Sequence, residues 1–149
     1  MRIFIDTNII LEFIDHRSEY NSVRSILADI RNGNSVGVVS QGCVYTLAFL
    51  IERSLKARGI HKPEQTVQLR RLLRSVLSLV EPIGITRQDM LNAIENEDFD
   101  DIEDSFQYQS ALKHHCDVLV TINIDDFQHA DCQALEILTP SEFIAKYLH

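Results

Sequence analysis

The sequence predicts an α/β fold in which a central parallel β-sheet is covered by helices. Short apolar, β-branched segments alternate along the chain with longer amphipathic segments, and that alternation favours parallel strands joined by helical crossovers. Polar side chains directly follow three of the predicted strands, which is where an open α/β sheet places its functional site. No linker or internal repeat interrupts the 149 residues, so we expect a single domain that covers residues 1–149.

The elements of the N-terminal half are predicted by residue type and by signals at helix ends. Gly33 and Gly59 each end a helix, because glycine readily adopts the left-handed conformation that follows a last helical turn. Ser40 is a good N-cap, and Pro63 suits the start of a helix. The expected elements are a strand at residues 2–5, helices at about 8–14 and 19–32, a strand at 36–39, a helix between Ser40 and Gly59, and a helix from Pro63 to Leu77.

The elements of the C-terminal half are predicted in the same way. Thr86 and Asp89 have the spacing of a capping box, and Thr139 with Glu142 gives the same signal before a final helix. The expected elements are a strand at residues 80–85, a helix after Thr86 that carries residues 90–94, a helix at about 100–115, strands at 118–121 and 135–138, and a helix after Thr139.

Charge is segregated along the chain. The net charge of −8, taken alone, argues against a nucleic-acid binder. However, seven acids fall within residues 95–104, and seven of the fourteen lysines and arginines fall within residues 53–74. An enzyme that holds a divalent cation and acts on a polyanion needs both regions. Arg70, Arg71 and Arg74 cluster on one side of a predicted helix and are candidates for steering RNA, with an ordinary solvated helix face as the alternative.

The sequence carries no signal for a membrane or for secretion. No apolar run approaches the ~20 residues that span a bilayer. Asp6 and Asn8 interrupt the first apolar stretch before any plausible signal-peptide cleavage site. We therefore expect a cytoplasmic protein that has no membrane partner.

Three acidic segments that lie far apart in the sequence are candidates for one metal site. Asp6 directly follows the first strand, Asp104 lies on the helix predicted at 100–115, and Asp126 follows the fourth strand after a short turn. An N-cap role is the structural alternative for Asp6. Carboxylates gathered from three regions repel each other unless a cation joins them. An oxygen-only ligand set suits Mg²⁺ or Mn²⁺ rather than zinc.

Helical spacing separates the acids around Asp104. Asp101 and Asp104 are three residues apart and share one face of a helix, whereas Glu103 is rotated by about 200° from Asp101. We therefore expect Asp101 to line the same pocket as Asp104, and Glu103 to point away from it. The alternative is that this acidic run is a solvated helix N-terminus stabilised by the helix dipole.

Four segments, in their order and spacing, resemble the motifs of PIN-domain nucleases. The segments are Phe4–Leu11, Asp104–Gln107 together with Ala111, Leu119–Phe127 and Ile137–Phe143. The resemblance spans the chain from Arg2 to Phe143. It implies a three-layer α/β/α fold, Mg²⁺ or Mn²⁺ as the cofactor and endonucleolytic cleavage of RNA.

The resemblance also implies roles for individual residues of this sequence. Asp6, Asp104 and Asp126 would bind the metal and carry catalysis. The residues that would support them by hydrogen bonds or face the bound phosphate are Asn8, Thr121 and Asn123, and Ser40 is a further candidate because it follows the second strand. Many small bacterial members of the family are VapC-like toxins that form homodimers. An antitoxin protein and a second copy of the chain are therefore expected partners.

One position departs from the family pattern. The second motif usually places a Glu on the helix after the second strand, and here Thr46 holds the expected position. A branch of bacterial PIN proteins looks similar and carries an E-D pair in the third motif, which Glu103–Asp104 matches. The loss of one negative ligand should weaken metal affinity. Asp101 is expected to compensate, because it lies one turn before Asp104 on the same face.

The expected function is that of a metal-dependent endoribonuclease, the toxin of a type II toxin–antitoxin pair. Two alternatives stay open. The first is a PIN fold with weakened catalysis that works as an RNA- or protein-binding module, which Thr46 favours and the three intact aspartates oppose. The second is a phosphatase-like hydrolase with Asp6 as nucleophile. That chemistry usually shows a D-x-D motif, and Asn8 holds its second position.

Overall fold

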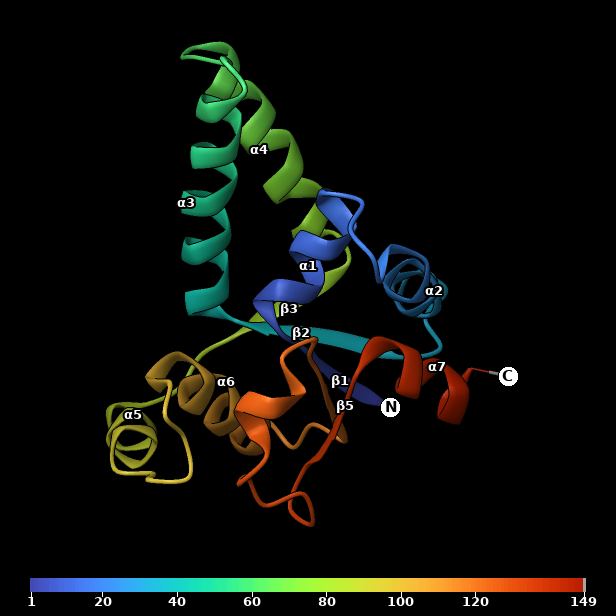
Figure 1. Cartoon of the computed structure of the whole chain (residues 1–149), viewed down its shortest axis with the longest axis vertical. Coiled ribbons are helices and arrows are strands. Elements are labelled where there is room, and N and C mark those ends of the chain that lie inside the picture. Colours follow the sequence, from blue (N-terminus) through green and yellow to red (C-terminus); the bar gives the residue numbers. More distant parts are fainter. Residues whose placement is uncertain (149) are drawn as a thin grey trace.

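The structure, a computed structural model, describes residues 1–148. In these residues a five-stranded, wholly parallel sheet in the order β3-β2-β1-β4-β5 is covered by helices on both faces (Figure 1). The strands are β1 (Arg2–Ile5), β2 (Val36–Ser40), β3 (Val80–Ile83), β4 (Val118–Val120) and β5 (Glu136–Leu138). The helices are α1 (Thr7–Ile14), α2 (Tyr20–Arg31), α3 (Gln41–Ala57), α4 (Glu64–Leu77), α5 (Arg87–Ile94), α6 (Ile102–Lys113) and α7 (Pro140–Tyr147), with a short 3₁₀ turn η1 (Ile124–Phe127). The predicted α/β/α fold class is confirmed.

The two faces of the sheet bury two separate hydrophobic clusters because successive strand residues point to opposite sides. In β1, Ile3 and Ile5 pack against α1, α2, α3 and α7, whereas Phe4 packs on the other side with residues of α6. Val39 and Val38 divide in the same way in β2. Figure 1 shows α1 to α4 and α7 on one side of the sheet, with α5 and α6 on the other.

Parallel register brings the carboxyl ends of the central strands to one edge. Ile5 of β1 lies beside Val120 of β4, and the backbone N–H of Asp6 donates to the carbonyl of Val120 at 3.1 Å. On the other side, Ser40 of β2 pairs with Ile83 of β3. The residues that follow β1, β2 and β4 therefore meet at the same edge of the sheet, where such folds place their functional sites.

The predicted helix caps are present. The Thr86–Asp89 and Thr139–Glu142 pairs form capping boxes, and the Ser40 hydroxyl accepts the N–H of Cys43 at 3.1 Å. The main differences from the expected boundaries are at β3, which ends at Ile83, and at α6, which begins at Ile102 because Asp101 is its N-cap. No helix in the described part of the chain is long and apolar enough to cross a membrane.

Candidate active site

Asp6 stands at the centre of the polar groups at this edge. It occupies the N-cap position of α1, but its side chain makes no cap hydrogen bond. Its carboxylate accepts the Thr121 hydroxyl at 2.8 Å and is only 3% exposed. Burial raises the pKa of Asp6 above its ordinary value of 3.8, and the Thr121 hydrogen bond works in the opposite direction. The capping alternative therefore does not account for this carboxylate.

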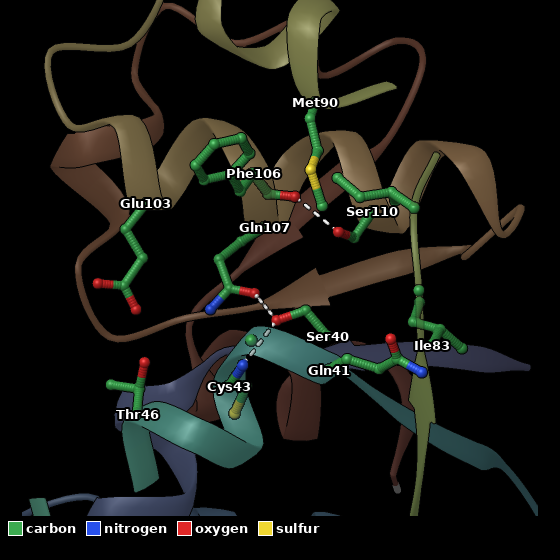
Figure 2. Close-up of a pocket in the computed structure, with 13 residues that line it drawn as sticks. Ser40, Gln41, Cys43, Thr46, Ile83, Met90, Glu103, Phe106, Gln107 and Ser110 are labelled. Carbon is green, nitrogen blue, oxygen red and sulfur yellow. Dashed lines mark hydrogen bonds between the residues drawn. The ribbon is translucent and has the colours of Figure 1, made fainter. Parts of the chain in front are cut away.

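Gln107 of α6 ties the ends of β1 and β2 together from the other face of the sheet. Its amide nitrogen donates to Thr7 Oγ1 at 3.0 Å and to Asp6 Oδ1 at 3.5 Å. Its amide oxygen accepts the Ser40 hydroxyl at 2.8 Å (Figure 2). The side chain is 2% exposed, so this buried amide is satisfied at both of its ends. The network holds the Asp6 carboxylate in one orientation.

The charged form of the Asp104 carboxyl is also disfavoured. Burial raises the pKa of Asp104 from 3.8 to about 7, and the negative charges of neighbouring acids add to that effect. These acids are, in decreasing order of effect, Asp6, Asp101, Asp126 and Glu103. Acids at the N-termini of α1 and α6 and in η1 thus act electrostatically on one carboxyl group, as expected for an acidic cluster drawn from separate parts of the chain.

Within the described residues, this acidic cluster (Asp6, Asp101, Glu103, Asp104 and Asp126) forms no ion pair with a protein cation. Within residues 1–148, the ion pairs of the structure all involve other acids. In the same residues, no three His, Cys, Asp or Glu side chains stand close enough together to hold a metal ion. The donor chemistry and the uncompensated charge fit a hard divalent cation, but the carboxylates are not gathered into a ready-made cage.

The expected positions of Asp101 and Glu103 need correction. Asp101 is the N-cap of α6 with an extended backbone, and its side chain accepts the N–H of Glu103 at 2.8 Å. The helical phase counted from Asp101 therefore does not apply, because that residue lies outside the helix. Glu103 lines the cavity beside the cluster, where its charge raises the pKa of Asp6, and the prediction that it points away is wrong.

A cavity of about 480 Å³ adjoins the cluster between the N-terminus of α3 and α6. Figure 2 shows Thr46 of α3 and Glu103 of α6 on the same side of this cavity, with Gln107 at its middle. Thr46, the residue at the expected second-motif position, thus faces the site and is half-buried. Whether a carboxylate at this position would bind metal stays a prediction.

The remaining candidates lie at varying distances from Asp6. Asn8 is half-buried in the first turn of α1. Asn123 contacts the network through its main chain, since its N–H donates to Thr121 Oγ1 at 3.1 Å while the residue itself is exposed. Asp126 is exposed in η1. The three candidate arginines Arg70, Arg71 and Arg74 are exposed on α4, which contributes no residue to the cavity.

Sequence reasoning overlooked three residues that the structure places at the site. Gln107 follows Asp104 by three residues on α6, so the i, i+3 spacing applied to the acids would have found it. Thr7 belongs to the first motif, but in the sequence analysis the supporting role in that motif is assigned to Asn8. Glu103 was excluded by helical phase. In each case the backbone position was predictable, but the hydrogen-bond partner across the sheet was not.

The chain belongs to the PIN domain family. The family model for the PIN domain matches residues 2–125. Among curated proteins, the chain is similar to Ribonuclease VapC1 of Aquifex aeolicus (strain VF5), at 24% identity over 152 residues, with 98% of this chain and 95% of that protein covered. The family suggested by the four sequence motifs is thereby confirmed.

Solved structures of similar fold come from toxin–antitoxin complexes. One is VapBC2 from Rickettsia felis bound to a DNA fragment from its promoter, with a TM-score of 0.66, 20% identity and coverage of 93% of this chain and 98% of that chain. Another is VapBC-1 from nontypeable Haemophilus influenzae, with a TM-score of 0.61, 20% identity and coverage of 95% and 99%. A toxin–antitoxin complex from Klebsiella pneumoniae matches with a TM-score of 0.59 at 21% identity, covering 93% and 97%. At these identities the likeness establishes the fold.

Proposed function

We propose that this protein is a metal-dependent endoribonuclease that acts as the toxin of a toxin–antitoxin pair in the cytoplasm. The observation that carries the proposal is the buried, uncompensated Asp6 carboxylate beside Asp104, at the sheet edge where the fold places its sites. Membership of the PIN family and the similarity to a curated ribonuclease support it. Complexes of toxin with antitoxin among the structural neighbours support an antitoxin as partner, and a homodimer is the oligomer that we expect.

Asp6, Asp104 and Asp126 are the residues that would hold a divalent cation, with Mg²⁺ and Mn²⁺ as the ions their oxygens suit. Such an ion, when bound, lowers the pKa of a water molecule and offsets negative charge on a phosphate. The chain itself fixes one of these ligands. Thr121 and Gln107 hold the two oxygens of Asp6 in place, so little reorganisation of that carboxylate is needed when a cation arrives.

Glu103 is the residue best placed to stand in for the missing second-motif acid. It lies on the same side of the cavity as Thr46 and raises the pKa of both Asp6 and Asp104 through its charge. Asp101 contributes charge to Asp104, but its oxygen is engaged in capping α6. We propose Glu103 as the fourth carboxylate, whereas Asp101 would add its charge at Asp104 while it caps α6.

A weakened PIN module that binds RNA or protein without cleaving it is the second candidate, and Thr46 is the observation that favours it. The two proposals differ in cleavage of a fluorescently labelled single-stranded RNA by the purified protein. The endonuclease proposal expects cleavage with Mg²⁺ or Mn²⁺, none with EDTA, and a loss of at least about a hundredfold in Asp6→Asn and Asp104→Asn. Asp98→Asn, an exposed acid outside the cluster, is the matched control and should cleave normally. Cleavage that persists in EDTA, or equal activity in all variants, would refute the proposal.

A further inference from the structure

The cavity beside the acidic cluster contains more space and more apolar wall than a metal site requires. Its volume of about 480 Å³ lies within the range of roughly 300–1,000 Å³ that is usual for small-ligand sites. One end is shared with the cluster through Glu103 and Gln107. The other end, away from Asp6, is walled by Ile83, Ile85 and Met90. Figure 2 shows Ile83 and Met90 on the side opposite Glu103.

The lining offers no positive charge that would bind a phosphate at this far end. Glu103 is the only charged residue among the thirteen that line the cavity, and it is negative. No lysine, arginine or histidine lines the cavity, so an anion would meet repulsion without a counter-charge. A neutral group with apolar faces and polar edges fits better. In an RNA strand, that group is the base.

The polar groups of the far end suit the edge of a base. Gln41, in the first turn of α3, lines the cavity and is exposed, and its side chain has no hydrogen-bond partner within residues 1–148. A glutamine amide offers a donor and an acceptor side by side, which is the pairing pattern that base edges present. Phe106 and Met90 supply the aromatic and thioether surfaces on which base faces pack well.

The wall beside Gln41 is held in place by the fold. His114, at the end of α6, forms a hydrogen bond of 2.6 Å with the carbonyl of Gly84 and so fixes the segment that joins β3 to α5. A Cβ on Gly84 would stand 2.9 Å from the Gln41 amide oxygen, so the absence of a side chain there leaves room for the amide. Hydrogen bonds therefore hold the elements on both sides of the cavity in place.

From these observations we propose that the cavity is a nucleobase site, which receives an unpaired base of the RNA next to the bond that is cut. The proposal deepens and rests on the proposed ribonuclease function, because Glu103 belongs to both the base site and the acidic cluster, and Gln107 of the base site donates to Asp6 of the cluster. Gln41 would contact the edge of the base, and Met90, Phe106 and Ile83 its faces. The RNA is bound single-stranded here, since a base in a duplex has its edge paired and its faces stacked on neighbouring bases.

Free nucleosides test the site without metal and without cleavage. They are neutral, so the net charge of −8 does not repel them. Adenosine, guanosine, cytidine and uridine would each be titrated to millimolar concentration against isotopically labelled protein and followed by NMR. We expect at least one to shift the side-chain amide signals of Gln41 and Gln107 and the methyl signal of Met90. Ribose 5-phosphate, which lacks a base, should shift none of them.

Two variants and a control locate the binding. Gly42 lines the cavity, and a Cβ there would meet only Ser40 Oγ, at 3.9 Å, so the first atom of the Gly42→Leu side chain has room and the rest should occupy part of the cavity. It should weaken nucleoside binding by at least about tenfold. Gln41→Ala, at an exposed position, should weaken binding as well, and it covers the case in which Gly42→Leu fails to fold. Ala57→Leu, exposed at the far end of α3, is the matched control and should bind as the wild type does.

The outcomes are distinct. Shifts absent for all four nucleosides, centred elsewhere, or unchanged in folded Gly42→Leu and Gln41→Ala would overturn the base site. Shifts caused by N-acetyl-phenylalaninamide or N-acetyl-leucinamide but by no nucleoside would overturn it too, and would assign the cavity to a side chain of a protein partner. Because no catalysis is involved, nucleoside binding in a protein that cleaves no RNA would uphold the base site while the nuclease proposal failed. RNA cleavage without nucleoside binding would uphold the nuclease proposal while the base site failed.

Discussion

Neutralising Asp104 should stabilise the metal-free protein, and the gain should grow with pH. The folded protein raises the pKa of Asp104 from 3.8 to about 7, so it binds a proton there that the unfolded chain releases near pH 4. The stability that this proton contributes is therefore fully present below about pH 4, is lost as pH rises from there through the folded pKa of about 7, and changes little at higher pH. The separation of about three pH units corresponds to an upper figure of about 4 kcal/mol. Asp104 is partly exposed and its neighbours are screened by salt, so we expect about 2 kcal/mol at pH 8.

The assay is urea unfolding of wild type and Asp104→Asn in EDTA at pH 5 and pH 8. The variant should exceed the wild type by about 2 kcal/mol at pH 8 and by less than about 1 kcal/mol at pH 5, where the wild-type carboxyl is still protonated. Asp98→Asn, outside the cluster, should show no such pH-dependent difference. If Asp104→Asn were no more stable than the wild type at pH 8, burial and like charges would not be destabilising the ionised Asp104 carboxyl.

Three further changes probe the second-motif position, the hydrogen-bond network and the basic helix. Thr46→Glu should enlarge the rise in melting temperature caused by Mn²⁺, because an added carboxylate tightens the site; an equal or smaller rise would mean that Thr46 is not the second-motif position. Gln107→Leu leaves its buried polar partners unsatisfied and should lower the free energy of unfolding by about 1–3 kcal/mol, measured in urea; no loss would show that the network is not needed for stability. Replacing Arg70, Arg71 and Arg74 together by Ala should weaken RNA binding and flatten its salt dependence in fluorescence anisotropy, and unchanged binding would leave α4 as an ordinary solvated helix.

The fold was predictable because local signals and the burial pattern agree. Ile3, Phe4 and Ile5 alternate between two hydrophobic clusters, so a short apolar run indicated a strand buried on both faces. Cap residues such as Thr86 and Thr139 carried their own signal, and both form the capping boxes that their spacing indicates. Nothing in such a pattern states the order of strands. That order depends on packing between distant segments.

The site was predictable where it depends on strand ends and was missed where it depends on side-chain direction. Asp6 and Thr121 follow neighbouring parallel strands, so their proximity follows from the fold, and a 2.8 Å hydrogen bond joins them. Glu103 was misplaced because Asp101 was counted as part of the helix. The backbone of Asp101 is extended, with φ −102° and ψ 119°, and the Asp101 side chain caps α6 instead. An error of one residue at the start of α6 was enough to assign Glu103 to the wrong face of the helix.

In the proposed mechanism, Asp6, Asp104 and Asp126 bind one or two divalent cations that the ribonuclease activity requires. Anomalous diffraction from crystals of the protein soaked in Mn²⁺ tests it most directly, with Asp6→Asn crystals as the control. We expect a peak within about 2.5 Å of carboxylate oxygens of Asp6 and Asp104 in the wild type, and a weakened or absent peak in the variant. A peak only at other acids, or none at a Mn²⁺ concentration that supports RNA cleavage, would contradict it.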